Sequence, residues 1–224
     1  MRKKSSVSIV IPAYNEADLI ESTLIELCDY MKGLEDDYSW ELIIVNDGST
    51  DNTGNIIDSF ASEKENIITT HHKRNMGLGH AFRSGFSLCH GDYIITFDAD
   101  MSYSADHIER LLTKIIDTDS SMVIASPYME GGKVINVPWK RKFLSVAANR
   151  FLSYLARMNL NTITSMVRVY DRRFLRLLNL KGEKRCRSTL LLANTAPIPV
   201  FDLVSGLPGA HYYSKLTGLT DNVD

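Results

Sequence analysis

The chain has 224 residues, 44% of them hydrophobic, so it can bury the core of one domain, or of one domain with an appendage. It has no run of about 18 apolar residues, which argues against a membrane-spanning helix, and the apolar run near its start is too short for a signal peptide. The formal net charge of −2 hides an uneven distribution, because residues 1–137 carry 11 Lys and Arg against 22 Asp and Glu, whereas residues 138–187 carry 13 against 2. This division suggests two kinds of ligand.

Short apolar runs typical of strands alternate with helical patterns through the first half of the chain. Apolar strands that alternate with helices indicate an α/β fold, with a mostly parallel sheet covered by helices on both faces. The expected strands are Val7–Pro12, Trp40–Asp47, Asn66–His72, Asp92–Asp100 and Ser121–Tyr128, and the expected helices are Asn15–Met31, Thr50–Ser62, Gly77–His90 and Ala105–Asp117.

From about Pro138 the pattern becomes basic and helical, and no further strand is expected before the tail. Residues Lys142–Met158 place apolar side chains on one helical face, with Arg150 and Arg157 away from it. Such a helix either rests on an anionic membrane surface or packs its apolar face on the core, with its charges in solvent. The tail, Gly182–Asp224, contains one candidate strand and then a loop rich in Gly and Pro.

The cysteines and the paired histidines show no metal-binding pattern. Cys28, Cys89 and Cys186 are widely spaced and belong to no Cys-x-x-Cys pair, which favours reduced thiols and a cytosolic setting. His71 and His72 lack partners at metal-ligand spacing and are interpreted as loop residues.

Polar and acidic residues follow three of the expected strands. Because the carboxyl ends of parallel strands meet at one edge of a sheet, where ligands bind in α/β proteins, such residues predict a ligand site. The three strand ends read Tyr14-Asn15-Glu16, Asn46-Asp47-Gly48 and Asp98-Ala99-Asp100.

Asp98 and Asp100 stand one residue apart at the end of an apolar strand. Two carboxylates so close repel each other unless a cation lies between them. The pair therefore suggests a divalent cation that also contacts substrate phosphates and would act as a Lewis acid. The alternative is a solvated turn, and the position of the pair beside Glu16 and Asp47 favours the cation.

The stretch "IVNDGSTDNT" joins a strand to a helix. Gly48 permits a close backbone approach, and Ser49 or Thr50 can cap the helix. Asp47 can accept hydrogen bonds from a base or a ribose, the alternative being a well-capped turn with no ligand.

The stretch "HHKRNMGLGHAFRSG" places cations before a helix. Lys73, Arg74 and Asn75 precede the glycines that open it, so side-chain cations and helix N-terminal amides can meet a phosphate or a base.

Four motifs, "IVIPAYNEADLI", "IIVNDGSTDNT", "RNMGLGHAFRSGF" and "DYIITFDADMSYSADHI", resemble in order and spacing those of the family 2 glycosyltransferases of GT-A fold. Within that family the sequence is most similar to the dolichol-phosphate (polyprenol-phosphate) mannose synthases. The resemblance is strong over Val7–Met101 and continues through "ASPYMEGGKVINVPWKRKFLSVAANRFLS" and "TSMVRVYDRRFL".

The resemblance implies an inverting, metal-dependent transfer of a hexose from a nucleotide sugar to a polyprenyl or dolichyl phosphate. It favours GDP-mannose as donor, with UDP-glucose as the alternative, and Mg²⁺ or Mn²⁺ as cofactor. It implies a peripheral position at the cytosolic face of a membrane, on the lipid surface or on a membrane subunit, and no nucleic-acid partner. A lipid phosphate is already anionic, so it needs cationic positioning more than a general base.

The resemblance also assigns roles to residues. By this comparison Asp98 and Asp100 bind the metal and, with Arg141 and Arg168, form the catalytic set. Arg141, Ser145 and Arg168 match positions that contact donor or acceptor phosphate. The residues expected along the nucleotide sugar are Pro12, Tyr14, Glu16, Asp47 and Asp98.

The sequence departs from the family pattern at three places. Pro127 stands where an arginine is frequent, Thr162 stands where an acidic residue is common, and the chain diverges from about Gly182. We therefore expect a glycosyltransferase domain over residues 1–181 and a divergent or altered tail over residues 182–224. Two alternatives follow: a transferase that uses another acceptor, or a nucleotide-sugar-binding module that is inactive through its altered C-terminus.

Overall fold

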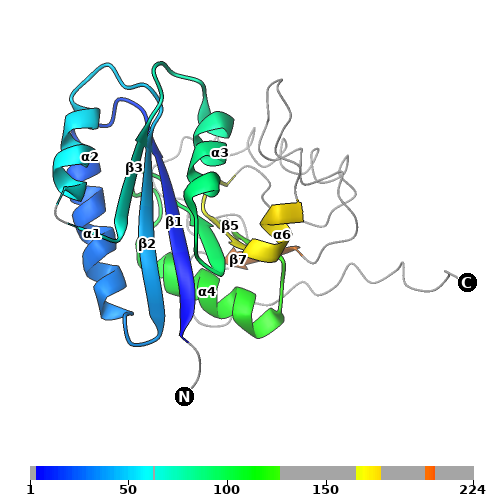
Figure 1. The fold of residues 1–224 in the computed structure, drawn as a ribbon. Coiled ribbons are helices and arrows are strands. Elements are labelled where there is room, and N and C mark those ends of the chain that lie inside the picture. Colours follow the sequence, from blue (N-terminus) through cyan, green and yellow to red (C-terminus); the bar gives the residue numbers. More distant parts are fainter. Residues whose placement is uncertain (1–3, 63, 127–164, 178–199, 205–224) are drawn as a thin grey trace, which may run out of the picture.

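The computed structural model describes residues 4–62, 64–126, 165–177 and 200–204. Within these residues seven strands form one sheet, with helices on both of its faces (Figure 1). The strands are β1 (Ser5–Ala13), β2 (Tyr38–Asn46), β3 (Ile67–His71), β4 (Tyr93–Thr96), β5 (Met122–Ser126), β6 (Arg168–Asp171) and β7 (Val200–Val204). The helices are α1 (Ile20–Gly33), α2 (Thr53–Ala61), α3 (Leu78–Leu88), α4 (Asp106–Thr118) and α6 (Arg172–Leu177).

The strand order is β3-β2-β1-β4-β6-β5-β7. Neighbouring strands run parallel in the pairs β1/β2, β2/β3, β1/β4 and β5/β7, whereas β6 runs antiparallel to both β4 and β5. The expected α/β architecture with a mostly parallel sheet is confirmed. The five expected strands and four expected helices are all present, with ends shifted by a few residues.

Strand β6 corrects the expectation that no strand lies between Pro138 and the tail. It is four residues long and begins with Arg168. Val167, directly before the strand, and Val169 within it are fully buried, and Arg168 and Tyr170 are buried as well. A strand buried on both faces shows no alternation of apolar and polar residues. A short strand of this kind that contains an arginine therefore cannot be distinguished by its pattern from the basic helical segment around it.

The candidate strand of the tail is confirmed as β7. It pairs with β5 along its whole length, from Met122↔Val200 to Ser126↔Val204. Part of the 182–224 segment therefore belongs to the same sheet as the first half of the chain.

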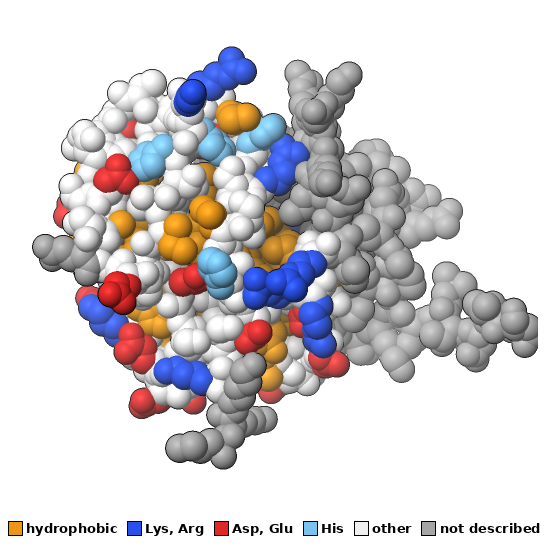
Figure 2. Space-filling model, in the orientation of Figure 1, with side chains coloured by type: hydrophobic (Ala, Val, Ile, Leu, Met, Phe, Trp, Pro, Cys, Tyr) orange, Lys and Arg blue, Asp and Glu red, His pale blue; other side chains and the backbone are white. Residues whose placement is uncertain are grey.

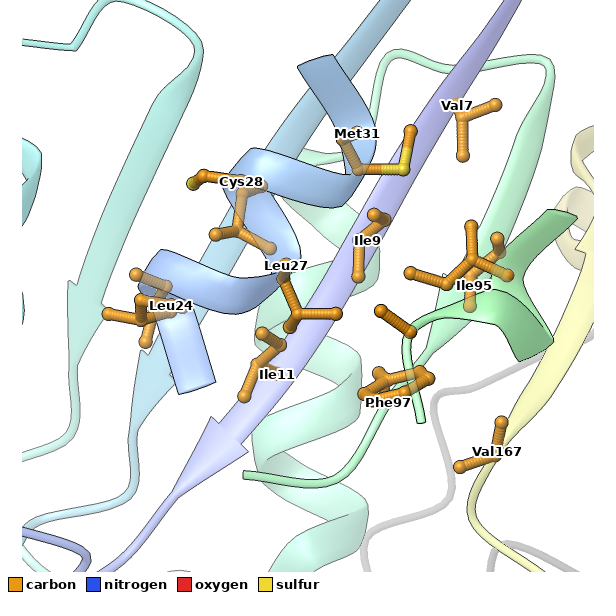
Figure 3. Close-up of a cluster of buried hydrophobic side chains, with 14 of the residues drawn as sticks. Val7, Ile9, Ile11, Leu24, Leu27, Cys28, Met31, Ile95, Phe97 and Val167 are labelled. Atoms are coloured by element: carbon orange, nitrogen blue, oxygen red, sulfur yellow. The ribbon is translucent and has the colours of Figure 1, made fainter. Parts of the chain in front are cut away.

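Two apolar layers hold the helices on the sheet. Alternate β1 residues Val7, Ile9 and Ile11 face a layer that includes α1, α2 and α4, with Leu24 and Leu27 of α1 against them (Figure 3). The intervening residue Val10 faces the other layer, with α3 and α6. Since β1 is covered on both sides, its residues from Ile9 to Ala13 are all apolar.

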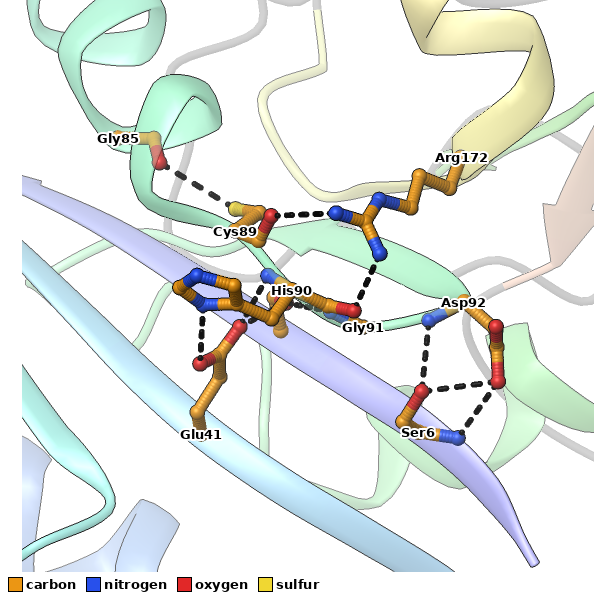
Figure 4. A network of polar contacts seen from close by, with 9 residues as sticks. Ser6, Glu41, Gly85, Cys89, His90, Gly91, Asp92 and Arg172 are labelled. Carbon is orange, nitrogen blue, oxygen red and sulfur yellow. Dashed lines mark hydrogen bonds and ion pairs between the residues drawn. The ribbon is translucent and has the colours of Figure 1, made fainter.

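The edge of the sheet at which the parallel strands begin, here called the amino edge, is closed by a network of polar contacts (Figure 4). The Arg172 guanidinium donates to the backbone oxygens of His90 and Cys89, at 2.6 and 3.3 Å, just after the end of α3. Glu41 of β2 accepts from the His90 amide at 2.5 Å, and Ser6 of β1 donates to Asp92 at 2.8 Å. These contacts tie α3, α6 and three strands together, far from the ends that carry the acidic motifs.

Candidate functional site

The acidic motifs meet at the opposite edge, where the parallel strands end, here called the carboxyl edge. From β1 the chain winds outward through β2 and β3 and then returns to place β4 on the other side of β1. In α/β sheets the crevice at such a reversal of strand order binds ligands. Strands β1 and β4 lie side by side in the sheet (Figure 1). Glu16 follows β1 and Asp98 follows β4, so the two residues lie at this position.

The Asp98-Ala99-Asp100 turn is anchored from below and from the side. Phe97 is fully buried and donates its amide to Val10 O of β1 at 3.0 Å. The Thr23 hydroxyl, buried in α1, donates to Ala99 O at 2.7 Å. Asp100 is exposed, and its carboxylate accepts from the amide and the hydroxyl of Ser102 at 2.9 and 2.7 Å. The turn is therefore held by its backbone and the Asp100 carboxylate stays at the surface.

The carboxylates of this edge lie close enough to disturb one another. Burial, followed by the nearby Asp100 carboxylate, raises the pKa of Asp98 to about 6. Burial, and then Asp100 and Asp51, raise the pKa of Glu16 above its usual range. Glu16, Asp51 and Asp100 thus contribute, with Asp98, to one negative environment. A cation bound there would relieve the repulsion between these carboxylates.

The β1–α1 and β2–α2 loops are bonded to each other. The Asn15 amide donates to the Ser49 hydroxyl at 3.0 Å, and Asn15 accepts from the Thr50 amide at 2.9 Å. The Glu16 amide donates to the Thr53 hydroxyl at 2.9 Å. The expectation that Ser49 or Thr50 caps α2 is wrong, because their polar groups bond the neighbouring loop; Asp51 accepts from the Thr53 amide at the start of α2 instead.

Asp47 lies at the end of β2 with its carboxylate turned into the protein. The His72 Nδ1 atom is 2.6 Å from Asp47 Oδ1, and the amides of Met76 and Gly77 donate to Oδ1 and Oδ2 at 3.0 and 2.8 Å. The Asp47 and His72 side chains are 5% and 10% exposed. The β3–α3 loop is therefore wrapped around this carboxylate.

The interpretation of both histidines as loop residues is only partly right. His71 is the last residue of β3, and its ring contacts Asn46 and Asp58. His72 lies in the loop but is half-buried and bonded to Asp47 and Ser84. A hydrogen bond between a histidine and a carboxylate 25 residues away leaves no local pattern, so the sequence did not predict the contact of His72 with Asp47. Histidine and basic side chains lie at the carboxyl edge, at the top of the view in Figure 2.

Gly48 makes the close backbone approach that its position suggested. Its φ is +71°, and a Cβ atom built there would lie 2.2 Å from the Arg74 carbonyl carbon and 2.5 Å from the Asn75 nitrogen. The β2–α2 turn and the β3–α3 loop thus touch through their backbones.

Arg168 begins β6 and pairs in register with Thr96, two residues before Asp98. It is 4% exposed, and its Nε donates to Ser165 O at 2.6 Å. The antiparallel β6 therefore brings Arg168 beside the strand that ends in the two aspartates. Arg141 and Ser145, the helix expected over Lys142–Met158, and the departures at Pro127 and Thr162 lie outside the described residues.

The carboxylates fit a hard divalent cation that takes part of its coordination from a ligand. Within the described part of the chain, no group of three or more His, Cys, Asp or Glu side chains is arranged to hold a metal by itself. Mg²⁺ in phosphate-transfer sites uses one or two carboxylates and completes its shell with phosphate oxygens and water. Asp98 and Asp100 supply that number and type of ligand. Among the described helices, none has the length and apolar character needed to cross a membrane.

Comparison with known proteins shows similarity over most of the chain. The sequence is 30% identical over 189 residues to a polyprenol monophosphomannose synthase from Mycolicibacterium smegmatis, covering 81% of this chain and 68% of the relative. It is 34% identical over 177 residues to an undecaprenyl-phosphate mannosyltransferase from Micrococcus luteus, covering 78% and 70%.

The fold is also found among solved structures. The mannosyltransferase PcManGT from Pyrobaculum calidifontis, solved with GDP-Man and Mn²⁺, superimposes with a TM-score of 0.55 at 18% identity. The similarity covers 80% of this chain and 48% of that one. This match confirms the GT-A fold. The family model for glycosyl transferase family 2 matches residues 8–178, and the chain therefore belongs to that family of glycosyltransferases.

Proposed function

We propose that this glycosyltransferase transfers a hexose from a nucleotide sugar to a polyprenyl phosphate, with inversion at the anomeric carbon. Mannose from GDP-mannose is the favoured donor, because both relatives described above are named as mannose-transferring enzymes that act on polyprenyl phosphates. The observation that carries the proposal is the group of carboxylates, Glu16, Asp98 and Asp100, at the place where the parallel neighbours β1 and β4 end, close enough to raise the pKa of Asp98 and of Glu16. Such a site is suited to a cation and the diphosphate that the cation accompanies.

On the donor side, Asp98 and Asp100 would hold Mg²⁺ or Mn²⁺. The cation, when bound, would neutralise charge on the departing nucleoside diphosphate. Tyr14 is 43% exposed at the end of β1 and offers an aromatic face along the nucleotide, next to Pro12 and Glu16. Asp47 would accept from the nucleoside through the one acceptor position that its protein contacts leave open.

On the acceptor side, Arg168 would position the lipid phosphate, together with Arg141 and Ser145. An oxygen of the phosphate attacks the anomeric carbon, the bond from that carbon to the donor diphosphate breaks, and the nucleoside diphosphate leaves with the electron pair. Because the attacking oxygen is already anionic, the chain needs to orient it and shield its charge, which a bidentate guanidinium does well. The polyprenyl chain of the acceptor implies that this edge works at a membrane surface.

The test is a transfer assay with the purified chain, Mn²⁺ or Mg²⁺, and labelled GDP-mannose or UDP-glucose. Polyprenyl phosphate is supplied in detergent. We expect a lipid-linked sugar that forms with GDP-mannose and requires the metal. A product only with UDP-glucose would replace the donor assignment, and no product with metal-dependent nucleotide binding would favour a binding module.

Asp100→Ala should abolish the metal-dependent transfer and leave the fold intact, since the Asp100 side chain is exposed and, among the described residues, its hydrogen bonds are with Ser102 in its own turn. Asp36→Ala is the matched control, because it removes an exposed aspartate from the α1–β2 turn. Circular dichroism would verify that both variants are folded. Full transfer by the Asp100 variant would remove that residue from the metal site.

A further inference from the structure

We propose that His72 is a positioning residue for the donor nucleotide, because it holds the Asp47 carboxylate and the β3–α3 loop in one arrangement at the carboxyl edge. This inference rests on the proposed function. His72 itself is not expected to contact the donor, since its side chain is 10% exposed and both ring nitrogens already have partners.

The contacts of the His72 ring indicate which ring nitrogen carries the hydrogen of the neutral form. Nδ1 lies 2.6 Å from the Asp47 carboxylate, which can only accept, so Nδ1 carries the hydrogen. Nε2 lies 2.8 Å from the Ser84 hydroxyl of α3, which donates to it when the ring is neutral. Both ring nitrogens of His72 thus have hydrogen-bond partners inside the protein, and the chain of carboxylate, imidazole and hydroxyl links the end of β2, the β3–α3 loop and α3.

The backbone of the same residue adds a second attachment to β2. The His72 amide donates to Asn46 O at 2.8 Å, directly before Asp47. Together with the amides of Met76 and Gly77, the histidine occupies three of the roughly four acceptor positions of the Asp47 carboxylate. The remaining position, on Oδ2, has a fixed direction because the other three are set.

This arrangement also determines what the loop presents to solvent. Lys73, Arg74, Asn75 and Met76 are all exposed, while the residues on either side of them are held by Asp47. Gly48 lies against the backbone of Arg74 and Asn75 and leaves no room for the loop to move inward. His72 therefore preorganises two things at once: the open acceptor of Asp47 and the loop beside the nucleotide, both of which lower the ordering cost of donor binding.

The test compares His72→Phe, which keeps a ring and loses both nitrogens, with His72→Asn, which keeps a donor near the position of Nδ1. Binding of GDP and UDP is measured by calorimetry in the presence of Mn²⁺, and Mn²⁺ with inorganic pyrophosphate serves as the probe without a nucleoside. We expect His72→Phe to weaken nucleoside diphosphate binding about tenfold or more, as for loss of a hydrogen bond to a charged group. Pyrophosphate binding should be unchanged, and His72→Asn should recover most of the nucleotide affinity.

His90→Phe is the matched control, because His90 also contacts a carboxylate, Glu41 at 3.2 Å, but at the amino edge. It should bind both probes as the unmodified chain does. If His72→Phe does not fold, Ser84→Ala decides, since it removes only the hydroxyl that supports Nε2 and should weaken GDP or UDP binding without affecting pyrophosphate.

Equal nucleotide affinity in the folded His72→Phe chain, or an equal loss for pyrophosphate and nucleotide, would overturn the positioning role. If the unmodified chain binds neither GDP nor UDP with Mn²⁺, the proposed function itself fails. That failure is seen in the unmodified chain, whereas failure of the positioning role is seen only in the His72 variants, so the two can be distinguished.

Discussion

At the scale of single residues, charge at the carboxyl edge depends on burial as much as on residue type. Asp98 and Asp100 are chemically identical and two positions apart, yet Asp98 is half-buried and Asp100 is exposed. The pKa of Asp98 is raised to about 6, mainly because its charged form is taken out of water. In the folded chain Asp98 therefore changes charge within a pH range that leaves ordinary surface carboxylates ionised.

This difference predicts a pH dependence of metal binding. A carboxylate must be ionised to bind a cation, so at the proposed metal site Mn²⁺ would compete with a proton at Asp98 below about pH 6. Between pH 7 and pH 5 we expect Mn²⁺ affinity to fall about tenfold, as protonation of a group with that pKa requires. Electron paramagnetic resonance titration of Mn²⁺ at both pH values measures this. Equal affinity at pH 5 and pH 7 would show that Asp98 is not a ligand.

At the scale of elements, the two loops around Asp47 pack through backbone atoms, so side-chain volume decides whether they fit. Both Gly48 and Gly77 have positive φ, at +71° and +88°. A Cβ at Gly48 would overlap the backbone of the β3–α3 loop, whereas one at Gly77 would meet nothing within 4 Å. The two glycines therefore separate the cost of strain from the cost of a clash.

Gly48→Ala should lower the free energy of unfolding by about 2–4 kcal/mol, from positive φ together with the clash. Gly77→Ala should cost about 1–3 kcal/mol, because its φ of +88° and ψ of 157° belong to a region that essentially only glycine populates, and no clash is added. Urea unfolding of the two variants provides the comparison. Equal losses would mean that the loops separate readily and are not packed as described.

The side chain of Arg172, the first residue of helix α6, bonds to the backbone that follows α3. Its guanidinium donates to two backbone oxygens that follow α3 (Figure 4). Arg172→Met should lower the free energy of unfolding by about 1.5–3 kcal/mol, because two carbonyl groups lose a charged partner.

Arg173→Met is the matched control for that change. Arg173 is 84% exposed and pairs with Asp171 at the surface, so its loss should change stability far less than the loss of Arg172 does. Thermal or urea unfolding of both variants tests the difference. Similar losses in the two would assign the effect to charge and not to the carbonyl contacts.

At the scale of the whole molecule, two apolar layers share one sheet and should unfold together. Cys28 lies in the layer with α1, and Cys89 lies in the layer with α3. Both thiols are free and buried, and burial raises the pKa of Cys89 to about 12 and that of Cys28 above its usual range. They are therefore protonated and shielded in the native chain.

We expect both thiols to react with a thiol reagent only as the chain unfolds, at the same urea concentration. The measurement uses a Cys186→Ser background, so that the two buried thiols alone are counted, with mass spectrometry to distinguish them. Reaction of Cys89 well before Cys28 would show that the α3 layer opens independently of the α1 layer.

The sequence by itself determined the class of fold, the order of the first nine elements and the residues at the carboxyl edge. It could do so because each of these depends on neighbours in the chain. Apolar runs such as Val7–Pro12 predict buried strands, and the polar residues that follow them must lie where parallel strands end. The resemblance to the family motifs added the proposed roles of Asp98 and Asp100.

Only the tertiary structure decided which distant residues meet. Strand β6 inserts antiparallel beside β4 and brings Arg168 next to Thr96, 72 positions earlier in the chain. His72 contacts Asp47 and Ser84 because two loops and a helix converge there. Neither contact has a local signature. Short buried strands and histidines in polar loops both occur in many sequences, and neither pattern reveals the distant residue that it contacts. Burial, which raises the pKa of Asp98, likewise arises only when the layers pack around the sheet.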